Sequence, residues 1–145
     1  AFAWESAEDR QLLQQALSKF GLQGRADQWM HTLSGGERRR VSLACVWVQQ
    51  ARVMLLDEPL SQLDWAYQTA VAEHFHHLAA EGRLVVWVTH DPNMALRYAT
   101  HALALTRQGE WIQGTVDKVV TSEVLSKVYG CDINQVQSKS LLFPA

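Results

Sequence analysis

The chain has 145 residues, of which 48% are hydrophobic and 19% are charged, a composition typical of one globular domain with its own core. Its formal net charge of −2 argues against a general nucleic-acid-binding surface. No apolar run reaches the ~18 residues that a membrane-spanning helix requires.

The first predicted element is an amphipathic helix over residues 6–20. Ser6 and Asp9 have the spacing of a capping box, in which each side chain accepts a hydrogen bond from the backbone amide of the other residue. Gly21 ends the helix, and a polar linker follows over 22–32. One face of the helix is apolar and carries Leu12, Leu13, Ala16, Leu17 and Phe20.

A glycine-rich stretch precedes the next helix, which is predicted over 35–50. It consists of Leu33-Ser34-Gly35-Gly36-Glu37. Ser34 and Glu37 form a second capping box. The two glycines lack a Cβ atom, so their amides can approach an anion closely, and the helix start carries a partial positive charge. Two interpretations are open here: a phosphate contact, or a capped structural helix after a glycine turn.

Three arginines, Arg38 to Arg40, lie in the first two turns of this helix. Three consecutive helical residues point in three different directions, so they do not form one basic face. We therefore expect a solvated or ion-paired helix surface here and no contact with nucleic acid.

Two short apolar runs, over 53–56 and 84–88, predict strands. A helix that Asp64 opens, and that ends near Ala80, separates them. Continuous apolar runs are typical of strands that are buried on both faces. A strand–helix–strand unit of this length predicts parallel strands with a right-handed crossover.

The remaining elements are shorter. Asp91 and Pro92 satisfy the residue preferences for the start of a helix, which ends near Ala99. After it we expect a hairpin of 102–106 with 110–113, helices over 116–120 and 122–129, and short strands over 132–137 and 141–143.

Polar side chains follow the two central strands. Asp57 and Glu58 come directly after the first strand, and His90 follows the second. Ligands of open parallel sheets bind beyond the carboxyl ends of the strands. One carboxylate can hold Mg²⁺, and the other can act as general base toward a water molecule. His90 can hold that water or a phosphate oxygen.

A metal site elsewhere is less favoured. His74, His76 and His77 share one predicted helix, but no cysteine or carboxylate completes a ligand set beside them. We expect a solvated helix surface at these three residues.

The order of the motifs resembles the ATP-binding-cassette (ABC) ATPases. Residues 33–37 match the signature of that family, 53–58 match its Walker B strand with the catalytic glutamate, and 61–64 match its D-loop. His90 matches the switch histidine. The resemblance implies an α/β fold of the P-loop NTPase (RecA-like) type, with a parallel sheet and helices on both faces, from which the N-terminal half with the Walker A strand is absent.

The resemblance also implies roles for single residues. Asp57 would serve Mg²⁺, Glu58 would polarise the attacking water, and His90 would sense the γ-phosphate of ATP. The signature would contact ATP held by the opposite subunit of a head-to-tail homodimer, and the D-loop would link the two sites. The cofactor-binding residues implied are Leu33, Ser34, Gly35, Gly36, Glu37, Ser61 and Asp64.

One motif of the family is not in this sequence. No Gly-x-x-x-x-Gly-Lys-Ser/Thr loop is present to wrap the β- and γ-phosphates. We therefore expect a C-terminal fragment of a longer ATPase, without ATP turnover on its own. The strand that ends at His90 would have an open edge, to be covered by a separately supplied N-terminal half or a swapped copy.

The expected domain layout follows from the same resemblance. Residues 1–50 would end the helical subdomain and include the signature helix. Residues 51–108 would form the C-terminal part of the RecA-like core. Residues 109–145 would form a C-terminal hairpin, short helices and a tail.

Three further segments narrow the resemblance. Residues 24–27, residues 125–131 and the closing Leu-Leu-Phe-Pro are similar to importers of iron-siderophores, haem and cobalamin, with the cobalamin branch favoured. Membrane permease subunits would be the partners, on the inner, cytoplasmic face of the cell membrane. The alternatives are a non-transport ABC ATPase that acts on DNA or ribosomes, and a non-catalytic interaction module.

Overall fold

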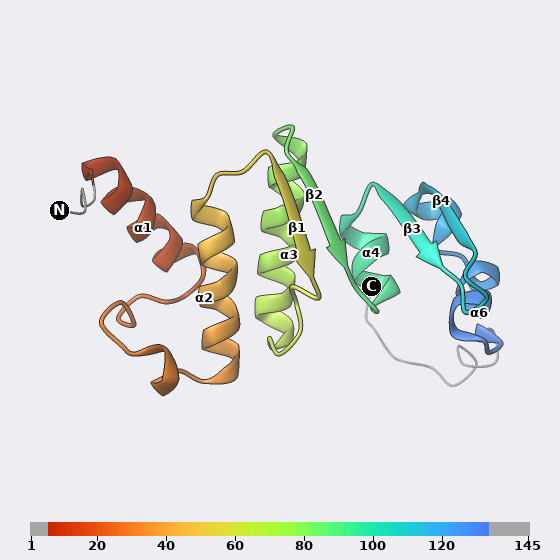
Figure 1. Cartoon of the computed structure of the whole chain (residues 1–145), viewed down its shortest axis with the longest axis horizontal. Helices are drawn as coiled ribbons and strands as arrows, with labels where there is room; N and C mark the ends of the chain where they lie inside the picture. The colour runs from red at the N-terminus through yellow and green to blue at the C-terminus, as the bar shows by residue number, and fades with distance from the viewer. Residues whose placement is uncertain (1–5, 134–145) are drawn as a thin grey trace. The chain divides into compact units, whose positions relative to one another are not determined.

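A computed structural model describes residues 6–133 as two compact units, one within Ala1–His90 and the other within Asp91–Ala145. Figure 1 labels the elements of both units. The first unit contains α1 (Ala7–Lys19), a 3₁₀ turn (Met30–Thr32), α2 (Gly35–Val48), β1 (Val53–Asp57), α3 (Trp65–Ala80) and β2 (Leu84–Val88). The second contains α4 (Pro92–Tyr98), β3 (His101–Leu105), β4 (Trp111–Thr115), α5 (Val116–Val119) and α6 (Ser122–Tyr129).

The helices of the first unit begin where their capping residues predict. Ser6 caps α1 and Ser34 caps α2, each within a complete capping box. The carboxylate of Asp64 accepts a hydrogen bond of 3.0 Å from the amide of Tyr67 and so caps α3. Local sequence therefore sets the start of each helix.

The parallel pairing of β1 with β2 is confirmed. The register runs from Val53 opposite Leu84 to Asp57 opposite Val88, with α3 as the connection. Because the strands are parallel, the residues that follow Asp57 and Val88 emerge at the same edge of the sheet.

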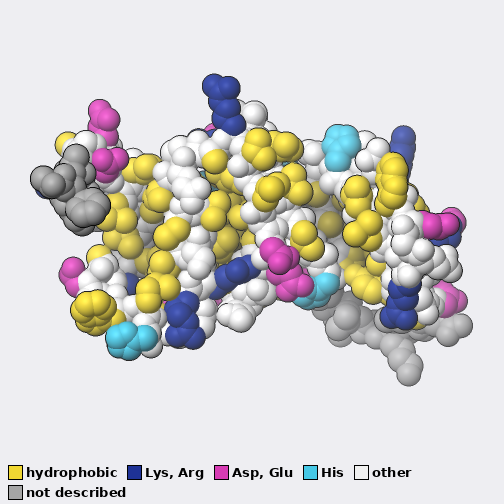
Figure 2. All heavy atoms as spheres, viewed as in Figure 1, with side chains coloured by type: hydrophobic (Ala, Val, Ile, Leu, Met, Phe, Trp, Pro, Cys, Tyr) yellow, Lys and Arg dark blue, Asp and Glu magenta, His cyan; other side chains and the backbone are white. Residues whose placement is uncertain are grey.

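The expected burial of both sheet faces is wrong for the described part of the chain. Met54 and Leu56 are buried, whereas Leu55 is 75% exposed and Val88 is 60% exposed. Within the first unit, the helix α3 packs against β2, whereas the alternate side chains of β1 and β2, Leu55 and Val88 among them, are exposed. Figure 2 shows hydrophobic side chains at the surface over β1 and β2. An apolar run thus indicates that both faces of a strand can be buried. It does not show that the layers that would cover both faces are present in the described part of the chain.

The core of the first unit lies among its three helices. Phe75 and Ala72 of α3 are fully buried, as are Ala16 of α1 and Phe20 and Leu22 just after it. Burial of such side chains stabilises the unit by roughly 1.5–3 kcal/mol each for the larger residues. This packing holds the start of α2 and the connection before α3 in fixed positions within the unit.

The second unit is built on an antiparallel hairpin. β3 pairs with β4 from His101 opposite Thr115 to Leu105 opposite Trp111, which confirms the predicted hairpin. The helix α6 ends at Gly130, whose φ of 68° is left-handed and suits glycine. The strands expected over 132–137 and 141–143 fall almost wholly outside the described residues. Among the described helices, none is long and apolar enough to span a bilayer.

Candidate functional site

The strand tip after β1 brings two of the predicted site residues together. The Oε1 atom of Glu58 lies 3.1 Å from Nδ1 of His90. Both side chains remain substantially exposed, at 48% for Glu58 and 76% for His90. Acidic and histidine side chains gather at this end of β1 and β2 in Figure 2. A carboxylate and an imidazole that contacts it are thus held at one sheet edge.

The backbone of Glu58 is unusual. Its φ of 42° lies in the left-handed region, which non-glycine residues rarely adopt. Its amide donates to the carbonyl oxygen of Val88 at 3.0 Å and so extends the ladder by one step beyond β1. The chain turns directly afterward, and the amide of Ser61 donates to the Glu58 carbonyl at 3.1 Å. Strained backbone of this kind persists where surrounding structure holds it and clusters at functional sites.

Asp57 is the predicted metal ligand. Its side chain is exposed at the end of β1, on the same face of the sheet as Leu55. Within residues 6–133 no group of three histidine, cysteine or carboxylate side chains could hold a metal ion. A single carboxylate still suits Mg²⁺, because that ion keeps several waters and completes its shell with substrate phosphates. The donor set therefore fits Mg²⁺ bound together with a nucleotide.

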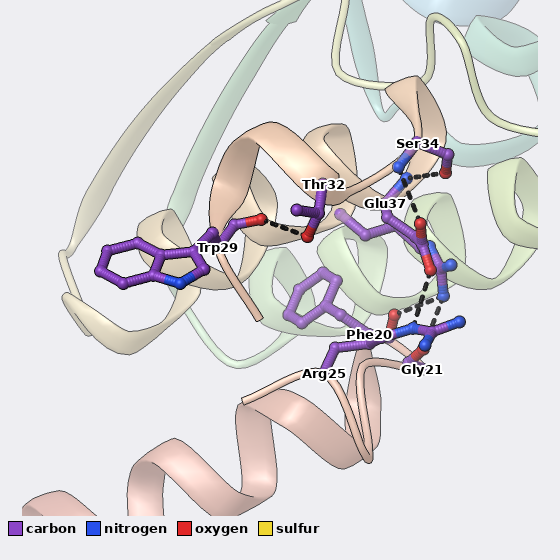
Figure 3. A network of polar contacts seen from close by, with 8 residues as sticks. Phe20, Gly21, Arg25, Trp29, Thr32, Ser34 and Glu37 are labelled. Atoms are coloured by element: carbon purple, nitrogen blue, oxygen red, sulfur yellow. Dashed lines mark hydrogen bonds and ion pairs between the residues drawn. The ribbon is translucent and has the colours of Figure 1, made fainter. Parts of the chain in front are cut away.

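The start of α2 is a doubly anchored cap. Ser34 Oγ accepts from the Glu37 amide at 3.2 Å, and Glu37 Oε2 accepts from the Ser34 amide at 2.8 Å. The other carboxylate oxygen of Glu37 accepts from Nε of Arg25 at 2.9 Å, as Figure 3 shows. The hydrogen bond from the Ser34 amide is the main reason that the pKa of Glu37 is lowered. Glu37 thus stays ionised and fixes the cap.

The two glycines between the capping residues have their own environment. Both lie in the first turn of α2, where backbone amides have no carbonyl partner within the helix. A Cβ atom on Gly36 would lie 3.3 Å from the carbonyl oxygen of Gln62, and one on Gly35 would lie 3.7 Å from Oε1 of Gln62. The glycines therefore leave two amides available to an anion and allow the segment after β1 to pack closely against α2.

The remaining predicted binding residues are placed as follows. The side chain of Leu33 is buried, so it contributes to the core of the unit. Asp64 caps α3, and Ser61 lies in the turn that follows Glu58. The side chain of Ser34 is engaged with Glu37. These residues shape the loops around the strand tip, and their contacts with a ligand stay predictions.

The three arginines of α2 differ from the expectation. They were expected to be solvated or ion-paired, but each donates to backbone carbonyl oxygens. Arg38 bonds to Leu33, Arg40 bonds to Phe20 and Gly21, and Arg39 bonds to all three residues of Asp57-Glu58-Pro59. A sequence pattern does not show which backbone carbonyl oxygens of distant turns will lie near a side chain. The hydrogen bonds of these arginines therefore could not be predicted from the sequence. Arg39 contacts the turn that holds Glu58, and sequence reasoning did not predict this contact.

The expectation of a solvated surface is also wrong for His74. Its ring packs against Phe20 and Trp47, with ring centroids 6.1 and 6.0 Å away, and its buried Nε2 has no hydrogen-bond partner among the described residues. Burial, helped by the nearby positive charge of Lys19, lowers the pKa of His74 to about 4. His74 is therefore a neutral packing residue, whereas His76 and His77 are exposed.

Comparison with known proteins supports the resemblance to the ABC ATPases. The model of the ABC transporter family matches residues 2–61. The ferric enterobactin transport ATP-binding protein FepC of Escherichia coli (strain K12) is 40% identical over 125 residues, which cover 85% of this chain and 46% of FepC. The hemin import ATP-binding protein HmuV of Ruegeria sp. (strain TM1040) is 39% identical over 139 residues, or 90% of this chain and 54% of that protein.

A solved structure is similar to this chain and indicates the same family. An inward-facing conformation of a metal-chelate type ABC transporter superposes with a TM-score of 0.75 at 31% identity, covering 90% of this chain and 52% of the matched chain. The P-loop NTPase fold class is thereby confirmed. The chain spans about half the length of the curated relatives that it matches.

Proposed function

The chain is homologous to the ATP-binding proteins of ABC transporters, and from that premise we propose that it is part of an ATPase that drives import of an iron-siderophore or haem compound. The relatives named above act in ferric enterobactin and hemin transport. The observation that carries the proposal is the Glu58–His90 pair, which lies at the strand tip beside an exposed Asp57. The cobalamin branch stays a prediction.

The placement of the strand-tip residues supports a proposed role for each of them. Glu58 would accept a hydrogen bond from the attacking water and take its proton, and His90, which contacts the Glu58 carboxylate, would orient it and contact the γ-phosphate of ATP. Asp57 would hold Mg²⁺, which neutralises charge on the phosphates when bound. Because both catalytic side chains are exposed, substrate can reach them without a rearrangement of the sheet.

The start of α2 serves a second copy of the protein. We propose that the amides of Gly35 and Gly36, between the capping residues Ser34 and Glu37, contact ATP bound to the opposite subunit of a head-to-tail dimer. The Ser61–Asp64 segment would connect the two sites. In this arrangement the start of α2 would contact the ATP of the opposite subunit, and the strand tip would contact the ATP bound to its own subunit.

The assembly needs parts beyond this sequence. The loop that wraps the β- and γ-phosphates would come from an N-terminal half, as a separate or connected segment or a swapped copy. Membrane permease subunits at the inner, cytoplasmic face of the membrane would be the transport partners, and nucleic acid would not be one. The layout would be a helical subdomain to residue 50, a RecA-like core segment to 108, and a C-terminal part to 145.

The test is carried out on the assembled transporter. Membranes that contain the ATPase with its permease and solute-binding protein should show ATP hydrolysis stimulated by ferric siderophore or hemin. Glu58→Gln should lower kcat by about 10²-fold or more while ATP still binds. Glu73→Gln, an exposed change on α3, is the matched control and should leave kcat unchanged. Unaltered hydrolysis in Glu58→Gln would contradict the proposal, whereas stimulation by cobalamin alone would assign the protein to the cobalamin branch.

A further inference from the structure

We propose that Arg39 is a positioning residue, which holds the Glu58 turn from the signature helix and thereby sets the Glu58–His90 pair. The role of this contact in ATP cleavage rests on the proposed function, whereas the geometry does not. Arg39 belongs to α2, and Glu58 follows β1, so the contact joins two elements of the first unit.

The contact has three parts. Nη2 of Arg39 donates to the carbonyl oxygen of Asp57 at 2.7 Å and to that of Glu58. Nε of the same side chain donates to the carbonyl oxygen of Pro59 at 3.3 Å. One guanidinium group therefore gathers three consecutive carbonyls of a single turn. Arginine suits this task because its five donors form a rigid planar fork, which lysine lacks.

The gathered turn is the one with the strained backbone. Convergence of three carbonyl oxygens requires a sharp reversal of the chain, and Glu58 at the centre of that reversal has a φ of 42°. Its amide is bonded to Val88 of β2. Arg39 thus anchors the turn to α2, while the amide anchors it to the sheet. Loss of either anchor lets Glu58 relax to a common conformation, which would swing its carboxylate away from His90.

The position of Arg39 on α2 gives the contact a consequence. The residue lies about one helical turn beyond Gly35 and Gly36, on a helix whose start is fixed by the Ser34–Glu37 cap. A rigid helix transmits a shift of its first turn to its second. Phosphate bound at the glycines would therefore bias the alignment of Glu58 in the same chain through Arg39.

A matched control is the next residue. Arg40 has the same charge as Arg39 and lies on the same helix. Its Nη1 atom also donates to two backbone carbonyl oxygens, those of Phe20 at 3.1 Å and Gly21 at 2.7 Å. Its guanidinium lies 4.1 Å from the ring centroid of Tyr67. Its contacts do not include the Glu58 turn, so its loss tests the general effect of removing an arginine from α2.

The experiment reads the Glu58–His90 pair directly. The 145-residue chain is labelled with ¹³C at the glutamate carboxyl carbons, and the Glu58 signal is assigned by its disappearance in Glu58→Gln. His90→Ala should shift that signal in the parent chain and in Arg40→Met. In Arg39→Met the same His90→Ala change should shift it by less than about a third as much, because the pair is already lost.

The outcomes separate the alternatives. A His90→Ala shift of full size in Arg39→Met, or a loss of the shift in Arg40→Met as well, overturns the inference. If circular dichroism shows that Arg39→Met does not fold, Arg39→Lys replaces it and should lose at least half of the shift, and retention of the full shift overturns the inference. No nucleotide enters these measurements, so failure of the proposed function would show only in the transporter assay. There Arg39→Lys should lower kcat about tenfold with little change in KM.

Discussion

Glu58 and His90 are separated by 32 positions in the sequence, yet Oε1 of the first lies 3.1 Å from Nδ1 of the second. The parallel register explains the distance, since Asp57 and Val88 are directly paired and each strand delivers its next residues to the same edge. The geometry of the candidate site is therefore a property of the β1–β2 register and of the turn that Arg39 holds.

The first prediction concerns catalysis by this chain alone. The strand tip and the signature are present, but the sequence carries no Gly-x-x-x-x-Gly-Lys loop to position the transferred phosphate. We expect no phosphate release above that of Glu58→Gln when the purified 145-residue chain is incubated with ATP and Mg²⁺. A clear excess over that variant would show that this chain needs no such loop.

The second prediction concerns the cap of α2. Ser34→Ala removes the oxygen that accepts from the Glu37 amide and should lower the free energy of unfolding by about 1 kcal/mol. Urea titration followed by circular dichroism measures it. Ser6→Ala, which removes the corresponding oxygen from α1, should cost a similar amount. If Ser34→Ala costs nothing while Ser6→Ala does, the second cap is dispensable for stability.

The third prediction distinguishes the two glycines. A methyl group on Gly36 would press on the Gln62 carbonyl, which belongs to a left-handed residue with a φ of 65° and little freedom to shift. On Gly35 it would meet the flexible end of the Gln62 side chain. Gly36→Ala should therefore be less stable than Gly35→Ala by about 1 kcal/mol. Equal urea midpoints would mean that the loop yields freely.

The fourth prediction concerns pH. The pKa of His74 is lowered from 6.5 to about 4, so the unfolded chain binds more protons than the folded one between these values. The contribution of neutral His74 to the free energy of unfolding is therefore fully present above pH 6.5 and is lost as the pH falls toward 4. Because the ring is only half-buried, screening limits the loss to the order of 1 kcal/mol.

The check is a comparison of variants. His74→Gln should flatten the pH dependence of the free energy of unfolding in this window, and His76→Gln, an exposed change on the same helix, should not. Parallel curves for the parent chain and His74→Gln would assign the pH dependence to other groups.

The fifth prediction concerns the uncovered sheet face. Leu55 and Val86 are exposed on it together with neighbouring apolar side chains. Large apolar patches of this kind favour association. Light scattering should show that the isolated chain self-associates as its concentration rises, and Leu55→Thr with Val86→Thr should raise the concentration required several-fold. Leu13→Thr, on the exposed side of α1, is the control. A stable monomer at high concentration would contradict the prediction.

The sequence predicted what depends on local rules. The caps at Ser6, Ser34 and Asp64 need only residues a few positions apart, and the β1–α3–β2 unit needs only hydrophobic runs and a connecting helix. Contacts that depend on distant turns were not predicted. The carbonyl contacts of Arg39 and the aromatic surroundings of His74 arise only when the elements of the unit pack together, so charge and helical period alone predicted neither set of contacts.

The crossover between β1 and β2 also makes their pairing a longer-range event than closure of the β3–β4 hairpin. The β3–β4 hairpin closes through a tight turn, and such hairpins form on the order of 1–10 μs. Every β1–β2 pairing instead encloses the whole of α3, and contacts of this longer range form more slowly. A chain that ends before residue 90 would contain Asp57 and Glu58 but lack the His90 imidazole. The ¹³C signal of the Glu58 carboxyl group would therefore also report whether β2 has paired with β1.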